Sequence, residues 1–177
     1  MARTARPQIA VRRARRGEWR ELRDLRLRAL EADPLAFSST ADEERSLAEG
    51  RWRERAVKGA ESPDSSTWVA VGPRGRLVGM AVVAQVEGVQ HVFSMWVDPE
   101  VRGRGLGGRL LDAALTWARQ TCPGGEIHLE VNPRQAAAAA LYRSRGFRYT
   151  ASSRPLGHSG AEAVQEMVLS ALPADRP

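Results

Sequence analysis

The chain has 177 residues, with Lys+Arg 27 against Asp+Glu 21, a formal net charge of +6 and 42% apolar residues. This length fits one globular domain with one core, and charged residues interrupt every apolar run before the ~18 residues that a membrane helix needs. The single cysteine, Cys122, excludes an internal disulfide and a cysteine-rich zinc site, and residues 1–7 lack the apolar stretch of a signal peptide, so we expect a cytoplasmic protein.

The first part of the chain is predicted to form one strand and two helices. Residues 9–15 alternate loosely as a strand does, and apolar residues at spacings of three and four then predict a helix over 18–33. Thr40 and Glu43 have the spacing of a capping box, in which a hydroxyl and a carboxylate satisfy each other's backbone amides. We therefore expect a second helix over 40–57.

The remainder of the chain continues with three strands and then alternates between helices and strands. This order predicts an antiparallel meander followed by strand–helix–strand crossovers, which require parallel neighbours. The fold class is therefore α/β, with a mixed sheet of about seven strands flanked by about four helices. The strands are expected over 67–71, 77–86, 91–97, 127–131, 147–151 and 163–169, and the helices over 106–118 and 134–145.

A glycine-rich segment follows the strand expected over 91–97 and opens the next helix. Four glycines within residues 103–108 let the backbone approach a ligand closely, and the helix N-terminus beyond them offers free amides and a partial positive charge. Phosphate groups suit that geometry, and Arg102 and Arg104 would add charge-assisted hydrogen bonds to a diphosphate.

Two other phosphate motifs are compared with this segment. Gly103, Gly105 and Gly108 satisfy the dinucleotide pattern G-x-G-x-x-G, with Glu126 and Glu130 at about the distance of a ribose-binding acid. However, several residues separate the first glycine from its strand, and the segment does not lie in an opening β-α-β unit. No Gly-Lys-Ser/Thr ends the segment, which argues against a nucleoside triphosphatase loop, and an ordinary glycine-rich turn is the remaining alternative.

Two signatures together resemble the GNAT superfamily of N-acetyltransferases. The first is Val97-Asp98-Pro99 followed by Arg102-x-x-Gly105-x-Gly107 at the start of a helix, and the second is residues 139–147, in which a helix carries Leu-Tyr and closes with Gly-Phe. The resemblance covers roughly residues 9–169. It implies the acyl-CoA N-acyltransferase fold in a single N-acetyltransferase domain over 9–170, between a flexible N-terminus, 1–8, and a C-terminal tail, 171–177.

The resemblance also implies acetyl-CoA as cosubstrate and no metal. The coenzyme A diphosphate would lie on the loop amides, the pantetheine arm would pair with the preceding strand as a guest strand, and a bulge near Ser94 and Met95 would aim a backbone N–H at the thioester oxygen. Gln135 stands where the family often has Asn, and Asn132 could cover part of that role. The residues expected to bind the cosubstrate are Trp96, Val97, Arg102, Gly103, Arg104, Gly105, Gly107, Gly108, Asn132 and Gln135.

The resemblance further implies the catalytic residues. Tyr142 matches the position of the family's general acid, where a phenol of pKa ~10 can donate its proton to a leaving thiolate of pKa ~8.5. For the base we name Glu87, beside the turn into the cofactor-binding strand, and His91 or no dedicated side chain stay as alternatives. His158 lies in a loop that borders the acceptor site in the family, but we favour its interpretation as an exposed loop residue.

The predicted activity is transfer of an acetyl group from acetyl-CoA to a primary amine by direct attack. A small amine, an antibiotic-like amine and a peptide or protein amine all stay open as acceptors, and so does a homodimer. Selectivity is expected in the first two helices, their connecting loop 34–40 and the loop 152–162. The alternatives are a module that binds acyl-CoA without turnover and a nucleic-acid binder; against the latter, the arginines are spread along the chain and interleaved with acids, as solvated helix faces are.

Overall fold

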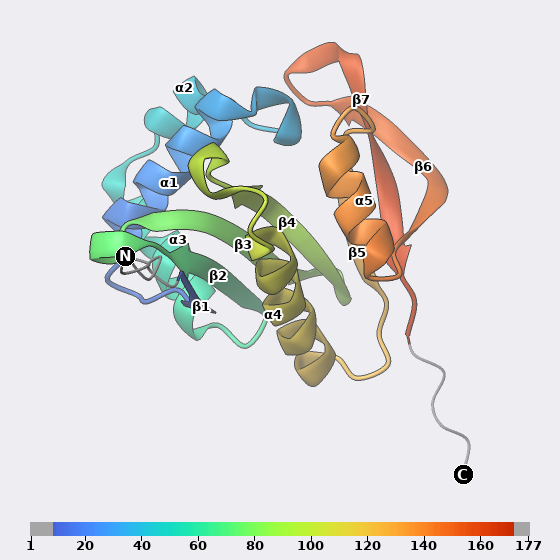
Figure 1. The fold of residues 1–177 in the computed structure, drawn as a ribbon, viewed down its shortest axis with the longest axis horizontal. Helices are drawn as coiled ribbons and strands as arrows, with labels where there is room; N and C mark the ends of the chain where they lie inside the picture. Colours follow the sequence, from blue (N-terminus) through green and yellow to red (C-terminus); the bar gives the residue numbers. More distant parts are fainter. Residues whose placement is uncertain (1–8, 172–177) are drawn as a thin grey trace, which may run out of the picture.

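The computed structural model describes residues 9–171, and their seven strands form one sheet in the order β1-β2-β3-β4-β5-β7-β6 (Figure 1). The expected N-terminal segment 1–8 and most of the expected tail, 172–177, lie outside the described residues. The strands are β1 (Ala10–Arg13), β2 (Ser65–Val71), β3 (Leu77–Val86), β4 (Val89–Val97), β5 (Ile127–Val131), β6 (Arg148–Leu156) and β7 (Ser159–Leu169). The helices are α1 (Trp19–Ala32), α2 (Ala41–Arg45), α3 (Glu49–Glu61), α4 (Leu106–Thr121) and α5 (Ala136–Ser144).

The sheet is mixed, as the order of elements predicts. Strands β1 to β4 form an antiparallel meander, β4 pairs with β5 in parallel across the α4 crossover, and β7 pairs antiparallel with both β5 and β6. Within residues 9–171, no helix is long and apolar enough to cross a membrane.

Helices pack on both faces of the sheet, and each face has its own core. On one face, Leu111 of α4 and Tyr142 of α5 belong to one buried cluster with Val92 and Leu129 of the sheet. On the other, α1 buries residues such as Leu25 against β2, β3 and β4. Fully burying one leucine side chain contributes roughly 1.5–3 kcal/mol, so these apolar stripes fix which face each helix covers.

The second expected helix is broken into two, which corrects the single helix predicted over 40–57. The capping box forms as expected, with the Thr40 hydroxyl accepting from the Glu43 amide and the Glu43 carboxylate accepting from the Thr40 amide. However, α2 ends at Ser46, whose hydroxyl donates to the Glu43 carbonyl oxygen over 2.7 Å. This hydroxyl takes the carbonyl that the Leu47 amide would use in a continuing helix. That amide donates instead to the Glu44 carbonyl oxygen over 3.3 Å, and α3 starts separately at Glu49.

The last two strands are longer than predicted. The segment 152–162, expected to be a loop, is mostly strand, and the turn is confined to its tip around Gly157 and His158. Arg154 of β6 forms an ion pair with Glu130 of β5, two strands away, which holds the extended hairpin against the sheet. Such a contact between distant residues is not visible in local sequence periodicity.

Strands β4 and β5 separate after a short contact, and β4 carries a bulge at that point. Their pairing runs only from Gln90 to Val92 on β4, although both strands continue beyond it. Opposite β3, the two residues Ser94 and Met95 replace one in the register, and Ser94 has a φ of 51°. The expected bulge and the expected separation of the two strands are therefore both confirmed.

Candidate active site

A cavity of about 630 Å³ lies where β4 and β5 have separated. Its walls are the end of β4, the glycine segment before α4 and the start of α5, and we call it the loop cavity. It brings together most of the residues expected at the site. These are Trp96, Val97, Arg102, Gly103, Gly105, Gly107, Gly108, Gln135 and Tyr142.

The glycine segment presents a row of free backbone amides to this cavity. Gly103 and Gly105 have φ values of 74° and 72°, in the left-handed region that favours glycine, and Gly105 is the N-cap of α4. The first helical hydrogen bond comes from the Arg109 amide, so the amides of residues 103–108 donate to no acceptor within the described part of the chain. Together with the helix dipole, they form a site for an anion.

The two arginines of this segment are placed differently. Arg102 lines the loop cavity, but its Nε donates to the Val97 carbonyl oxygen over 2.9 Å and its Nη2 forms an ion pair with Asp33. Arg104 is exposed and is not part of the cavity wall. A contact of either guanidinium with a diphosphate stays a prediction.

Asn132 and Gln135, the two residues considered for the pantetheine, are also placed differently. The Asn132 carboxamide donates to the Leu35 carbonyl oxygen and to Glu162, and it accepts from the Arg134 amide. It is buried and does not line the loop cavity, whereas Gln135 lines that cavity at the N-terminus of α5. Of the two, Gln135 is the one that faces the cavity.

Tyr142 lines the loop cavity from α5. It is almost completely buried, its ring lies edge-on to Phe147 at 6.1 Å between centroids, and its hydroxyl makes no hydrogen bond within residues 9–171. Burial raises the pKa of this phenol well above its usual value, because the charged phenolate would be poorly solvated there. The hydroxyl therefore keeps its proton at neutral pH.

The structure does not bring Glu87 to this site. It is exposed in the tight turn between β3 and β4, and it lies seven residues along β4 from the bulge at Ser94, or roughly 20 Å at the rise of a strand. His91 lies nearer, with its ring 5.7 Å from Phe93 and 5.4 Å from His128. Burial, followed by the neighbouring His128, lowers the pKa of His91.

Two residues at the cavity were missed by the sequence analysis. Asp33 accepts from the Trp96 indole N–H over 2.7 Å and pairs with Arg102, so it ties the end of α1 to the end of β4. Arg134 lines the loop cavity and forms an ion pair with Glu162 at 2.8 Å. Both contacts join segments that are far apart in the chain, and no local spacing signals them.

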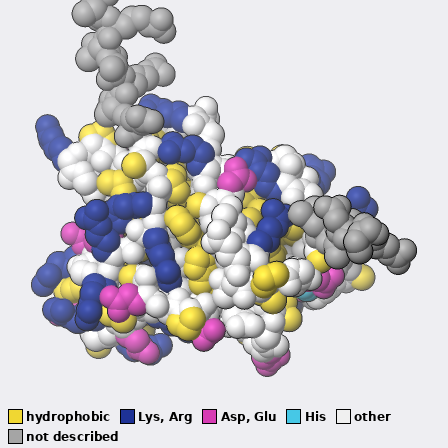
Figure 2. All heavy atoms as spheres, turned by 90° about the horizontal axis from the view of Figure 1, so that it is seen from below, with side chains coloured by type: hydrophobic (Ala, Val, Ile, Leu, Met, Phe, Trp, Pro, Cys, Tyr) yellow, Lys and Arg dark blue, Asp and Glu magenta, His cyan; other side chains and the backbone are white. Residues whose placement is uncertain are grey.

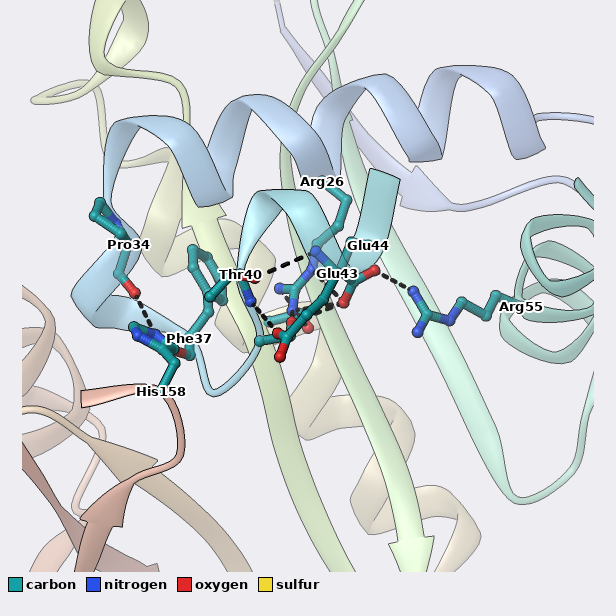
Figure 3. A network of polar contacts seen from close by, with 10 residues as sticks. Arg26, Pro34, Phe37, Thr40, Glu43, Glu44, Arg55 and His158 are labelled. Carbon is teal, nitrogen blue, oxygen red and sulfur yellow. Dashed lines mark hydrogen bonds and ion pairs between the residues drawn. The ribbon is translucent and has the colours of Figure 1, made fainter. Parts of the chain in front are cut away.

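The tip of the β6–β7 hairpin lies against the segment after α1, and these are two of the segments in which we expect acceptor selectivity. The His158 Nε2 atom lies 2.8 Å from the Phe37 carbonyl oxygen and 3.2 Å from that of Pro34, so the hairpin is fastened to the segment after α1 (Figure 3). His158 thus has backbone partners and does not point freely into solvent.

Comparison with known proteins gives a consistent result. The model of the acetyltransferase (GNAT) family matches residues 19–147. The peptidyl-lysine N-acetyltransferase YjaB of Escherichia coli is 30% identical over 82% of this chain and 86% of its own length. The N-alpha-acetyltransferase RimI of Mycobacterium tuberculosis is 41% identical over 52% of this chain and 61% of its own. The structure of yncA of Salmonella typhimurium with its cofactor acetyl-CoA superposes with a TM-score of 0.75 at 18% identity, covering 96% of this chain and 98% of that one.

Proposed function

The chain belongs to the acetyltransferase (GNAT) family and is an acetyl-CoA-dependent N-acetyltransferase, and from this premise we propose how its residues carry the reaction. The loop cavity takes acetyl-CoA, with the diphosphate on the backbone amides of residues 103–108. We also propose that residues 9–170 form the single domain that carries this activity.

The observation that carries this assignment is the run of amides without acceptors. A diphosphate gives up strongly bound water when it binds to a protein. Backbone amides fixed at a helix N-terminus can replace that water, and because they carry no net charge, no second ion has to be desolvated. The left-handed backbone at Gly103 and Gly105 turns the segment so that it enters α4 directly. The residues present therefore fit the group.

The separation of β4 and β5 provides the place for the pantetheine arm. Beyond Val92 the inner edge of β4 has no strand partner, so its main chain can pair with an extended ligand in the manner of a guest strand. Trp96 and Val97 belong to this unpaired part of β4, and Gln135 faces them across the cavity.

Acetyl-CoA supplies the thioester carbonyl that the acceptor amine attacks, giving an N-acetylated amine and free coenzyme A. Ser94 and Met95 lie in the bulge, outside the ladder with β3, and a backbone N–H there stabilises the negative charge that develops on the carbonyl oxygen. When the carbon–sulfur bond breaks, the Tyr142 hydroxyl donates its proton to the sulfur, and the phenolate then recovers a proton from water, which also takes the proton that the nitrogen loses on acylation. Its raised pKa keeps that proton available at neutral pH.

The attacking nitrogen has to be neutral. Two carboxylates lie near the bulge, Asp33 in the loop cavity and Glu44 on the other side of β4, and both are already held in ion pairs with arginine. We propose that the amine loses its proton to water. Glu87 is too distant for direct contact, and His91 lies on the strand beside the bulge without lining the loop cavity.

The nucleic-acid alternative receives no support from the surface in view. Basic side chains are spread over the face in Figure 2, with acidic and apolar side chains between them. A nucleic-acid site concentrates Lys and Arg along one continuous stripe, because it follows a line of phosphates.

The test combines binding with turnover. Titration calorimetry with acetyl-CoA is expected to show saturable heat, and coenzyme A release is expected with at least one member of a panel of small amines and peptides. Binding without release from any amine would favour the non-catalytic module. No binding would remove the assignment of the loop cavity altogether.

A further inference from the structure

A second cavity, of about 290 Å³, lies on the opposite side of β4 from the loop cavity. Ser94 lines this second cavity and its neighbour Met95 lines the first, so the bulge stands between the two. Strands β2, β3 and β4 form the floor, and α1, α2 and α3 form the cover. We call it the cationic cavity, because its wall contains Arg26, Arg55 and Lys58 against one acid, Glu44.

The charges in this wall do not balance. Glu44, only 6% exposed, pairs with Arg26 at 3.3 Å and with Arg55 (Figure 3). Arg26 also donates to the Ser94 hydroxyl over 3.2 Å, which links the ion pair to the bulge. Lys58 lines the same cavity and forms no ion pair within residues 9–171. Three cations thus face one carboxylate.

Donors without acceptors accompany this excess of positive charge. The hydroxyls of Ser65 and Thr67, on β2, line one end of the cavity and have no hydrogen bond within the described part of the chain. An oxyanion placed at that end would accept hydrogen bonds from these hydroxyls and would pair with Lys58.

The cavity has a fixed length across the sheet. Thr67 pairs with Val82, and Val82 pairs with Phe93, which directly precedes Ser94. Two strand spacings of ~4.8 Å therefore separate the donor-rich end on β2 from the bulge on β4, or about 10 Å. A ligand that reached both ends would be small and extended.

We propose that the cationic cavity binds the acceptor, and that the acceptor is a linear primary amine with a carboxylate about 10 Å from its nitrogen. The nitrogen lies at the bulge beside Ser94, and the carboxylate lies against Lys58 and the hydroxyls of Ser65 and Thr67. This inference rests on the proposed function, because it places the amine where the thioester is expected. The excess of cations would repel polycationic amines from the same cavity.

The experiment compares glycine, γ-aminobutyrate and ε-aminocaproate, each beside its carboxamide, in a coenzyme A release assay at fixed ionic strength. We expect kcat/KM to rise with the length of the acid and to be about tenfold higher for ε-aminocaproate than for its amide. Lys58→Gln should abolish that ratio, whereas Lys58→Arg should keep it. Arg51→Gln removes a charge from the exposed face of the same helix and should change nothing.

A binding readout independent of turnover comes from Lys58 itself, the only lysine in the chain. Acylation of its side chain by an N-hydroxysuccinimide ester, followed by mass spectrometry, reports whether the cavity is filled. We expect N-acetyl-ε-aminocaproate, the product of the proposed reaction, to slow this labelling, and its carboxamide to leave the labelling rate unchanged.

The outcomes separate the two proposals. Protection of Lys58 without coenzyme A release from any amine would support the cavity assignment and remove the proposed catalysis. Release at equal rates from acids and amides, or fastest release from glycine, would overturn the inference and leave the catalysis in place. Absence of protection by N-acetyl-ε-aminocaproate would also overturn it.

Discussion

The loop cavity and the cationic cavity lie on either side of one strand and are built in different ways. The first offers main-chain amides from one contiguous segment, residues 103–108. The second collects side chains from α1, α2, α3 and β2, which meet only in the folded protein. The site for the cosubstrate is therefore encoded in one short motif of the sequence. The site proposed for the acceptor depends instead on contacts between residues that are far apart in the chain.

The largest expected effect concerns the ion pairs of the cationic cavity. Glu44→Gln leaves Arg26 and Arg55 without their carboxylate, and loss of one partner of a buried pair costs about 3 kcal/mol or more of unfolding free energy. Urea unfolding at neutral pH measures this loss. Glu54→Gln, which breaks an exposed pair with Arg51, is the control and should change stability by less than about 1 kcal/mol.

The same carboxylate gives stability a defined pH dependence. Burial acts to raise the pKa of Glu44, but hydrogen bonds from Arg55 and Ser39 and the charges of both arginines bring it below its ordinary value. Its contribution is therefore fully present above the unfolded pKa of ~4.3 and is lost as the pH falls through the lower folded value. Glu44→Gln should remove this component, and an unchanged acid branch in the variant would contradict the assignment.

The next prediction tests the reacting end of the loop cavity. Tyr142→Phe should lower kcat about 100-fold, the lower end of the range for general acid catalysis, with little change in the affinity for acetyl-CoA. In the wild type, the raised pKa means that no loss of rate from phenol ionisation is expected below pH ~10. Steady-state kinetics and calorimetry together measure both quantities.

Glu87→Gln serves as the comparison for Tyr142→Phe. Because Glu87 is exposed in a turn remote from the loop cavity, its loss should leave kcat within about twofold. A fall comparable to that of Tyr142→Phe would restore Glu87 as the base and would contradict deprotonation by water.

A smaller effect than that of Tyr142→Phe is expected in the backbone of the glycine segment. Gly105→Val forces a β-branched residue into a φ of 72°, at a cost of about 1–3 kcal/mol, and should weaken acetyl-CoA binding roughly tenfold. Gly50→Ala, on the exposed side of α3 where an added Cβ meets no atom, is the control. Calorimetry measures the Kd for acetyl-CoA in each variant. Equal Kd values for Gly105→Val and the wild type would mean that the backbone amides do not hold the diphosphate.

The sequence predicted what depends on local pattern. The mixed sheet, the position of the glycine segment before α4 and the capping box at Thr40 all follow from spacing within a few residues, and all are confirmed. The break between α2 and α3 was not predicted, because the capping box marks where a helix begins and not where it ends, and the Ser46 hydroxyl turns back onto the helix.

The parts of the site that were missed arise from contacts across long stretches of chain. Asp33 belongs to the end of α1 by sequence, and only the fold places it between Trp96 and Arg102. Lys58 and Arg55 have the sequence context of a solvated helix face, and only the crossing of α3 over β2 turns them toward a cavity. The sequence shows which side chains are charged, but not which of them the fold turns toward a cavity.

Strands β4 and β5 share only a short parallel contact, so the sheet consists of two parts with little main-chain pairing between them. A ligand that pairs with the free edge of β4 would add hydrogen bonds that the polypeptide itself does not make between the two parts. Any ligand that binds only the folded state shifts the folding equilibrium toward it. Acetyl-CoA is therefore expected to raise the free energy of unfolding of this protein, in addition to its role as cosubstrate.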